Sequence, residues 1–197
     1  MADTIYAKAA PDTGGKFQPH AEGQFALKCV DVIDLGERVE QFADNPAKVA
    51  KKVALVYRSG ELNDEGSYME VTKELTVSMH EKAGLRKFLG QWRGKSYDDA
   101  EAEAGAPLHK LEGVYALASI EQRKSGSGKT YANIASIAPL PKAMPKPETG
   151  TYERAPYWAE RKATYAAEVA KFKGNAEPAP FSEKPKALQT EDDDLPF

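Results

Sequence analysis

The sequence has one cysteine, Cys29, and no long hydrophobic run. A chain with a single cysteine cannot form an intrachain disulfide, which agrees with the reducing cytoplasm. No apolar stretch reaches the roughly 20 residues that a transmembrane helix needs. The N-terminal stretch contains an early acid and no apolar core, so no signal peptide is predicted. These absences argue against a disulfide-stapled or membrane-spanning protein and favour a soluble, cytoplasmic one.

Ligands for metal ions are also scarce. The only histidines are far apart in the sequence: His20, His80 and His109. None has a cysteine or histidine partner at the spacing of a metal site. Four acids between Asp31 and Glu40 resemble the carboxylate set of a nuclease, but on a strand they fall on both faces. A solvated strand edge or turn is the better interpretation, and we expect no metal and no other cofactor.

The net charge is small, −3 at neutral pH, but the charge is unevenly placed. Four of the 30 acidic side chains lie at Glu191 to Asp194, so residues 1–190 hold 27 basic and 26 acidic side chains. The body of the chain is therefore nearly neutral, and the acidity is concentrated in the final segment. A local basic groove is compatible with this balance, because net charge does not report where the cations lie.

Alternating apolar and polar residues predict three strands in the first half of the chain. The first, at 23–42, is longer than a typical strand, so we expect a strongly curved strand or a hairpin bent near Gly36. Its alternation places one set of residues on the buried side: Phe25, Leu27, Cys29, Ile33 and Leu35. The second, at 51–61, has Val53, Leu55 and Tyr57 on one face. The third, at 67–79, is rich in β-branched and aromatic residues.

The apolar period then changes to that of a helix. Ser78 and Glu81 have the spacing of a capping box, which predicts an amphipathic helix of about three to four turns. Its buried stripe is expected to consist of Leu85, Phe88, Leu89 and Trp92. Residues 94–112 look irregular. Two further strands, at 113–123 and 129–140, flank the turn sequence KSGSG and predict a hairpin.

Three strands, a helix and a two-stranded hairpin follow one another in the order of an OB-fold, a five-stranded barrel with a helix between strands three and four. We therefore predict a mainly-β protein whose barrel covers residues 23–140. Other α+β meanders share this order. Residues 1–22 mix Gly, Pro, Asp and Thr, and we expect a flexible N-terminal arm there.

Residues 141–190 have the composition of a Pro- and Lys-rich linker. A helix is predicted within it at 157–173, where apolar residues recur at near-heptad spacing: Trp158, Tyr165, Val169 and Phe172. The pattern leaves three partners open for this helix, namely the barrel, a second subunit, or none. The linker leads to an acidic, disordered tail that ends in the tip 191–197.

The sequence SGSGKT at 125–130 resembles the end of a phosphate-binding P-loop. That motif needs a glycine where this chain has Arg123, and it opens a helix, whereas the following YANIASI has the pattern of a strand. We therefore predict a flexible basic hairpin tip and no nucleotide hydrolysis.

Cations and aromatic rings accompany the predicted strands. Single-stranded nucleic acid is held by cations along its phosphates and by aromatic faces on which bases stack. Such residues also decorate barrels that bind nothing, and alternation assigns about half of these tyrosines to the core. The candidate DNA-binding residues are Lys28, Lys52, Tyr57, Arg58, Tyr68, Lys73, Tyr115, Arg123, Lys124, Lys129 and Tyr131.

The segment 191–197 reads EDDDLPF. A purely solubilising tail has no use for an exposed leucine and phenylalanine, so acids followed by apolar residues indicate a docking peptide. The ring would fill a pocket of a partner, and the acids would speed and orient the encounter. The candidate partner-binding residues are Glu191, Asp192, Asp193, Asp194, Leu195, Pro196 and Phe197.

DDDLPF resembles the acidic tip of bacterial and phage single-stranded DNA-binding proteins, which usually reads Asp-Asp-Asp-Ile-Pro-Phe. The specific match covers about six residues, with Leu195 in place of isoleucine, while the OB-type order and the Pro-containing linker agree in architecture. The N-terminal strand motifs of the bacterial housekeeping proteins are absent, and the linker is rich in Lys, Pro and Ala instead of Gly and Gln. The chain therefore resembles a divergent, phage-type member.

The resemblance implies a non-enzymatic protein that coats and protects single-stranded DNA with little sequence preference. Its tip would recruit replication, recombination or repair proteins, in the host cytoplasm if the chain is phage-encoded. No membrane partner is expected, and a homo-oligomer is left open. Two alternatives remain: a small nuclease or other DNA-processing enzyme with the same docking tip, and an adaptor whose OB-fold binds protein.

Overall fold

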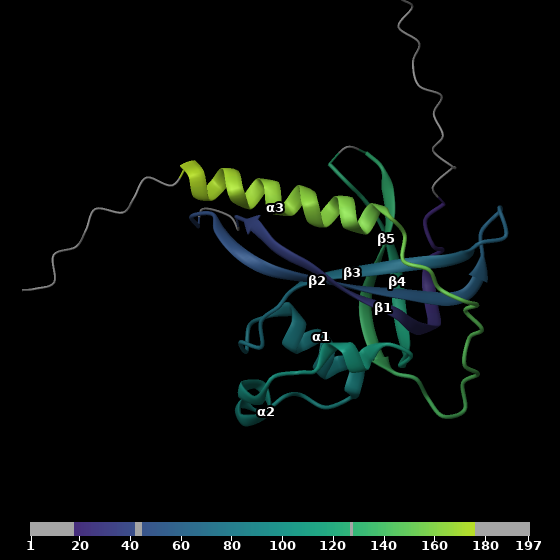
Figure 1. Ribbon diagram of the computed structural model, residues 1–197. Helices are drawn as coiled ribbons and strands as arrows, with labels where there is room; N and C mark the ends of the chain where they lie inside the picture. Colours follow the sequence, from purple (N-terminus) through teal and green to yellow (C-terminus); the bar gives the residue numbers. More distant parts are fainter. Residues whose placement is uncertain (1–17, 42–44, 127, 176–197) are drawn as a thin grey trace, which may run out of the picture.

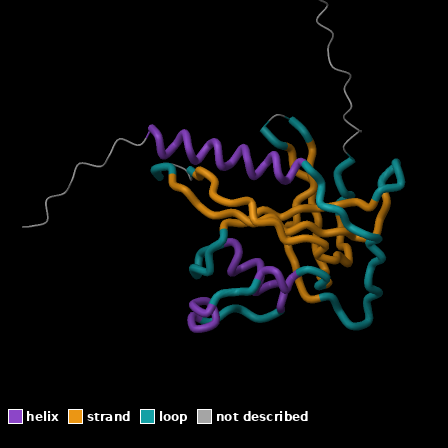
Figure 2. The backbone as a smooth tube through the Cα atoms, viewed as in Figure 1, coloured by secondary structure: helices purple, strands orange, loops and turns teal. Residues whose placement is uncertain are grey.

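The computed structural model describes residues 18–41, 45–126 and 128–175. Five antiparallel strands form one sheet in the order β3-β2-β1-β4-β5 (Figure 1). The strands are β1 (Gly23–Glu40), β2 (Lys48–Leu62), β3 (Tyr68–Thr76), β4 (Tyr115–Lys124) and β5 (Thr130–Pro139). The helices are α1 (Gly84–Arg93), α2 (Asp99–Ala104), the 3-10 turn η1 (Leu108–Leu111) and α3 (Tyr157–Asn175). Figure 2 shows α3 on one side of the strands and the shorter helices on the other.

The fold is mainly β, as predicted, and the predicted strands and hairpin are present. Most of the predicted arm (1–17) and the segment 191–197 lie outside the described residues. Within the described part of the chain, no helix combines the length and apolar character needed to cross a membrane.

β1 is a single curved strand, which is the first of the two shapes predicted for 23–42. Its pairing with β2 shifts register twice, between Cys29 and Asp31 and again between Asp34 and Gly36. Gly36 has φ +74°, and its amide donates to Oδ1 of Asp34 at 2.9 Å. Each extra residue bends and twists the strand. β1 can therefore pair with β4 at its start and with β2 along most of its length.

The predicted single buried side of β1 is wrong, because the first bulge exchanges the two faces of the strand. Leu27 and Cys29 face the core between the sheet and α1, whereas Ile33 and Leu35 face a second core under α3. A one-residue insertion reverses which side every later side chain occupies. The simple alternation counted across Val30 could not show this.

The first core joins all five strands to α1. The stripe Leu85, Phe88, Leu89 and Trp92 is buried there, as predicted. The predicted capping box is wrong: α1 begins at Gly84, and its cap residue Ala83 makes no side-chain capping bond. Ser78 Oγ instead accepts from the amide of His80 at 3.3 Å.

A capping box does occur further along, in the stretch predicted to be irregular. The Asp98 side chain accepts from the amide of Glu101, and the Glu101 side chain accepts from the amide of Asp98. This reciprocal pair starts α2. The D-x-x-E signal was present in the sequence, but no apolar run follows it to mark a buried helix.

The sheet is not closed, because β3 and β5 are its two free edges. The edges nevertheless lie close together: Lys73 Nζ on β3 donates to Asn133 Oδ1 at 3.0 Å and to the Ile134 carbonyl at 2.8 Å on β5. Val71 of β3 and Ile137 of β5 also share the first core. A side-chain bridge therefore spans the gap where a backbone ladder would close a barrel.

α3 confirms the predicted helix at 157–173, and its partner is the outer face of the sheet. Trp158 and Tyr165 share the second core with Ile33, Leu35, Ala54 and Val56 of β1 and β2. Lys173 and Glu37 pair at 2.9 Å near the far end of the helix. Of the three partners that the pattern left open, the structure selects the barrel-like sheet.

Residues 141–156, which were predicted as linker, run along the sheet before α3 begins. Arg58 donates to the carbonyls of Thr149 and Thr151, both at 3.0 Å, and Arg154 makes a bidentate pair with Asp31 at 2.7 and 2.6 Å. A side chain at Gly60 would put its Cβ 2.7 Å from the carbonyl oxygen of Glu148. The packed structure therefore continues past residue 140 to the end of α3.

Candidate nucleic-acid interface

An open cleft of about 620 Å³ lies between the two sheet edges and the start of α3. We call it the edge cleft. Its walls are residues 70–74 of β3, residues 131–133 of β5, and Tyr157, Trp158 and Arg161 of α3. The cleft exists because β3 and β5 approach one another without pairing, so that a groove follows the open seam.

Two tyrosines expose their rings at this cleft. Tyr131 on β5 is 41% exposed and Tyr157 at the start of α3 is 46% exposed. The neighbouring Trp158 is buried, and its ring centroid lies 4.7 Å from that of Tyr157. The packed tryptophan thus holds the exposed ring in place. Exposed, fixed aromatic faces are what base stacking requires.

Lys73 forms the floor of the cleft and is committed to the bridge between β3 and β5. Partial burial, together with the nearby charge of Arg123, lowers the pKa of the Lys73 ammonium below its ordinary value. Its protons point at Asn133 and at a backbone carbonyl. Lys73 therefore contributes positive potential to the cleft, while its direct role is to fix the two edges.

The carboxylates around the cleft are matched by arginines. Glu74 pairs with Arg161 at 2.8 Å, and Glu70 pairs with Arg58 at 2.7 Å. Glu121 pairs with Arg123 and accepts from the Asn133 amide at 2.9 Å, which lowers the pKa of Glu121. The acids therefore do not give the cleft a net negative wall.

The β4–β5 hairpin tip beside the cleft carries two exposed lysines, Lys124 and Lys129, and neither forms an ion pair with a described residue. The turn is closed by the Ser125 amide donating to the Lys129 carbonyl at 2.8 Å. Thr130 begins β5, so the glycine-rich loop leads into a strand and not a helix. This confirms the strand predicted after the P-loop-like sequence.

The predicted DNA-binding residues separate into three locations. Five of them lie in the edge cleft or on its hairpin: Lys73, Arg123, Lys124, Lys129 and Tyr131. Lys28 and Tyr115 pair at the opposite end of β4, about 30 Å from the hairpin tip at roughly 3.3 Å per residue. The exposed side chain of Lys146 also lies over the Tyr115 ring, 5.0 Å from its centroid.

The other four predicted residues have structural roles. Tyr57 is fully buried against Trp92, so its ring cannot stack on a base in this structure. Lys52 is buried and pairs with Glu40. Arg58 lies over the rings of Tyr68 and Tyr152 at 5.6 and 4.9 Å, under residues 149–152. Arg58 and Tyr68 thus contact residues 149–152 and join them to the sheet, and none of the four residues lines the edge cleft.

Tyr157 and Arg161 were missed as site residues by the sequence reasoning. Their helix was predicted, but without a partner its faces could not be assigned. The available signal was their position beside the buried stripe of Trp158 and Tyr165, which places them at the border between packed and solvent-facing sides.

The structure offers little for metal or thiol chemistry. The described residues contain no cluster of three or more His, Cys, Asp or Glu side chains that could hold a metal ion. Two of the acids considered for a nuclease form ion pairs instead: Asp31 pairs with Arg154, and Glu40 pairs with Lys52. Burial raises the pKa of the Cys29 thiol to about 12, which agrees with the predicted apolar role of that residue.

Comparisons of the chain with family models, with curated proteins and with solved structures returned no match. Function must therefore be argued from the cleft itself.

Proposed function

We propose that the protein is a non-enzymatic single-stranded DNA-binding protein of OB type, and that the edge cleft and the β4–β5 hairpin form its DNA-binding surface. The observation that carries the proposal is that two exposed tyrosines line one open groove, and that the hairpin beside it carries two exposed lysines with no ion pair to a described residue. Tyr131 and Tyr157 would stack on bases, while Lys124 and Lys129 would contact phosphates.

The proposed stacking residues come from two consecutive elements, β5 and α3, which residues 140–156 connect and which meet at this cleft. Both acids that line the cleft have a basic partner: Glu70 pairs with Arg58, and Glu74 pairs with Arg161. The phosphates of a nucleic acid therefore meet no unpaired carboxylate of these two residues. Stacking on tyrosine rings and contacts to phosphates are both sequence-tolerant, so we propose binding with little sequence preference.

The strand and helix order supports the OB assignment. Three strands precede α1 and two follow it, and the first core fills the space between the curved sheet and α1. In this proposal Lys73 completes with a side chain what a closed barrel completes with a backbone ladder.

We further propose that the segment 191–197 recruits replication, recombination or repair proteins in the cytoplasm, of a phage host if the chain is phage-encoded. This part of the proposal is supported by the sequence EDDDLPF alone, because these residues lie outside the described structure.

Titrating labelled oligo-dT with the full chain tests the DNA-binding proposal. Stacking is worth about 1–3 kcal/mol per base, so Tyr131→Ala and Tyr157→Ala should each raise Kd roughly 5- to 150-fold. Replacing both Lys124 and Lys129 with Ala should flatten the dependence of log K on log salt by about 0.7 for each phosphate that is no longer neutralised. The matched control replaces Lys82 and Lys87, which are exposed lysines outside the cleft.

Equal losses of affinity in the control and the hairpin variant would refute the cleft as the binding surface. No salt-dependent binding by the wild type would refute the function itself. The same samples, incubated with the oligonucleotide with and without magnesium, test the nuclease alternative: degradation that needs magnesium would favour the enzyme. A chain that binds no DNA but still captures proteins would favour the adaptor.

A further inference from the structure

A second concavity, with a volume of about 510 Å³, opens beside the C-terminal half of α1. We call it the α1 pocket. Its lining comes from α1, the residues before and at the start of β4, and the segment that follows β5. The apolar walls include Trp92, Tyr97, Leu111, Val114, Tyr115 and Met144. The volume lies within the range of pockets that hold small ligands, about 300–1,000 Å³.

Apolar side chains are left uncovered at this pocket. Val114 is 40% exposed and Met144 is 37% exposed, and they are two of only six large apolar side chains exposed to this degree in the described residues. Exposed apolar groups gathered around a concavity, with aromatic walls behind them, indicate an interaction surface.

The charged side chains that line the α1 pocket are all cations. They are Arg93, Lys142 and Lys146, and no aspartate or glutamate among the described residues lines the pocket. Lys142 and Lys146 are exposed and form no ion pair with any described residue. In the edge cleft, by contrast, Glu70 and Glu74 lie beside the cations. The α1 pocket therefore suits an occupant that is apolar and carries negative charge next to its apolar part.

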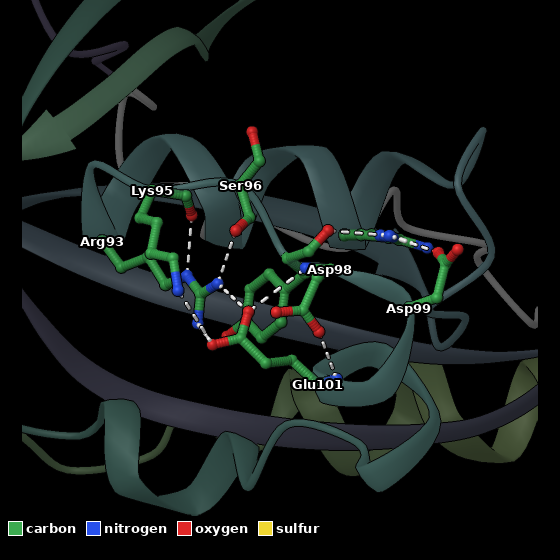
Figure 3. Close-up of polar contacts among 8 residues, drawn as sticks. Arg93, Lys95, Ser96, Asp98, Asp99 and Glu101 are labelled. Atoms are coloured by element: carbon green, nitrogen blue, oxygen red, sulfur yellow. Dashed lines mark hydrogen bonds and ion pairs between the residues drawn. The ribbon is translucent and has the colours of Figure 1, made fainter.

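A polar network holds Arg93 against the ring of Tyr97, and Figure 3 shows the contacts of Arg93 with Lys95, Ser96 and Glu101. The Arg93 guanidinium lies 3.6 Å from the centroid of the Tyr97 ring and donates to the carbonyls of Lys95 and Ser96, both at 2.7 Å. It also pairs with Glu101 at 2.5 Å. Arg93 is thus held by this network, and the cations available to an anionic occupant are the lysines.

We propose that the α1 pocket binds the chain's own segment Glu191–Phe197. Leu195 and Phe197 would enter the apolar pocket, and the four preceding acids would lie against Lys142 and Lys146. This segment holds the densest negative charge of the chain directly beside a leucine and a phenylalanine. Both required properties of the occupant therefore occur together in it.

Residues 176–190 connect the end of α3 to this segment. A flexible stretch of that length has an r.m.s. span of about 20–23 Å and can extend to about 50 Å. A folded body of this size has a radius of gyration of about 16 Å. The extended length exceeds the diameter of such a body, so the segment can reach the α1 pocket on the other side of the sheet from α3, and tethering raises its effective concentration there to at most the millimolar range.

Binding in this pocket would hide the segment from other proteins while leaving the edge cleft open. The proposal does not depend on what the edge cleft binds. It predicts competition between the pocket and partner proteins for the same seven residues, and no competition with a ligand of the edge cleft.

The experiment uses the full chain with Leu195→Ala and Phe197→Ala, so that its own segment is disabled, and titrates it against a labelled peptide of residues 189–197. We expect saturable binding below about 1 mM, the concentration at which a short tether would hold the segment. Met144→Glu should weaken binding at least tenfold, because it places an acid in the apolar wall. Leu62→Glu is the matched control, since Leu62 is 55% exposed and does not line the pocket.

Absence of binding, or equal weakening by Met144→Glu and Leu62→Glu, would overturn the proposal. Displacement of the peptide by oligo-dT, with Met144→Glu having no effect, would place the segment in the edge cleft and overturn it as well. DNA binding is measured on the same samples. If the wild type binds no DNA while the peptide still binds the pocket, only the proposed DNA-binding function is refuted. If the unaltered full chain binds added peptide only at a higher peptide concentration than the Leu195→Ala and Phe197→Ala variant does, its own segment occupies the pocket. If the unaltered chain instead forms a concentration-dependent dimer, the occupant is the segment of a second copy, and the intrachain form is overturned.

Discussion

Alanine substitutions of two neighbouring aromatic residues, Tyr157 and Trp158, should have opposite effects: one on DNA binding and the other on stability. They start the same helix, but Trp158 is 2% exposed in the second core and Tyr157 is 46% exposed at the edge cleft. Replacing a buried tryptophan with alanine typically costs 3–5 kcal/mol of unfolding free energy, so roughly that scale applies to Trp158→Ala. The Trp158 Nε1–H has no partner among the described residues, and burying such a group costs about 1–3 kcal/mol.

The expected net loss for Trp158→Ala is therefore about 2 kcal/mol, the difference between the midpoints of these two ranges, and a sizeable part of the roughly 5–15 kcal/mol that stabilises an ordinary domain. Tyr157→Ala should cost less than Trp158→Ala, about 1 kcal/mol, because nearly half of Tyr157 stays exposed to solvent. Trp158→Phe keeps a ring and removes the unpartnered N–H, so its loss should be smaller than that of the alanine variant.

Urea unfolding followed by far-UV circular dichroism measures all three variants without relying on tryptophan fluorescence. DNA binding is measured in parallel: Tyr157→Ala should lose affinity at the smaller cost in stability. Equal shifts of the urea midpoint for Trp158→Ala and Tyr157→Ala would refute the reasoning, because the two side chains would then not differ in packing. Near-native stability of Trp158→Ala would show that α3 is not part of the folded core.

Three further predictions concern single contacts. Gly60→Ala should lower the unfolding free energy by about 1–3 kcal/mol in urea melts, because Gly60 has φ +85° and a Cβ would meet the Glu148 carbonyl. Glu74→Gln should tighten oligo-dT binding up to about fivefold in a low-salt titration, because it frees Arg161 from its ion pair. An unchanged affinity would show that Arg161 does not contact the DNA. Arg93 lowers the pKa of Glu101 to about 2 from 4.5, so its stabilising contribution is full above pH 4.5 and is lost as the pH falls toward 2. The gap in urea midpoint between wild type and Glu101→Gln should therefore close over that range, and a constant gap contradicts the assignment.

The strands and the buried stripe of α1 could be predicted because both depend on local periodicity. Leu85, Phe88, Leu89 and Trp92 repeat at helical spacing, and their burial follows whichever surface the helix meets. β2 was also predicted with the correct face, since Val53, Leu55 and Tyr57 all enter the first core. Period-two alternation predicts these faces as long as no residue is inserted.

The two cores could not be predicted, because they depend on a bulge and on long-range packing. The bulge after Cys29 sends Ile33 to the opposite side from Leu27, and nothing in the local sequence marks it. The packing of Arg154 on Asp31 joins residues more than a hundred positions apart. A Pro-rich composition describes a segment that avoids regular structure, but such a segment can still be fixed by side-chain contacts.

The candidate site was partly predicted for a related reason. Charge and ring content identified Lys73 and Tyr131, which line the edge cleft, and the two lysines of the hairpin beside it. The same criterion also selected Lys52 and Arg58, whose charges are satisfied by Glu40 and Glu70. Composition reports which side chains can bind phosphate, whereas only the pairing of neighbours decides which cations are free to do so.

The open sheet and the edge cleft are one structural feature. If β3 and β5 were hydrogen-bonded along their length, the seam would be closed by backbone groups and no groove would follow it. Lys73 joins the two edges through its side chain, and no backbone ladder joins β3 to β5 in the described part of the chain. α3 then supplies the third wall, with Trp158 anchored in the second core and Tyr157 exposed beside it. The residues that stabilise the covered face of the sheet therefore also position the ring that we propose to stack on a base.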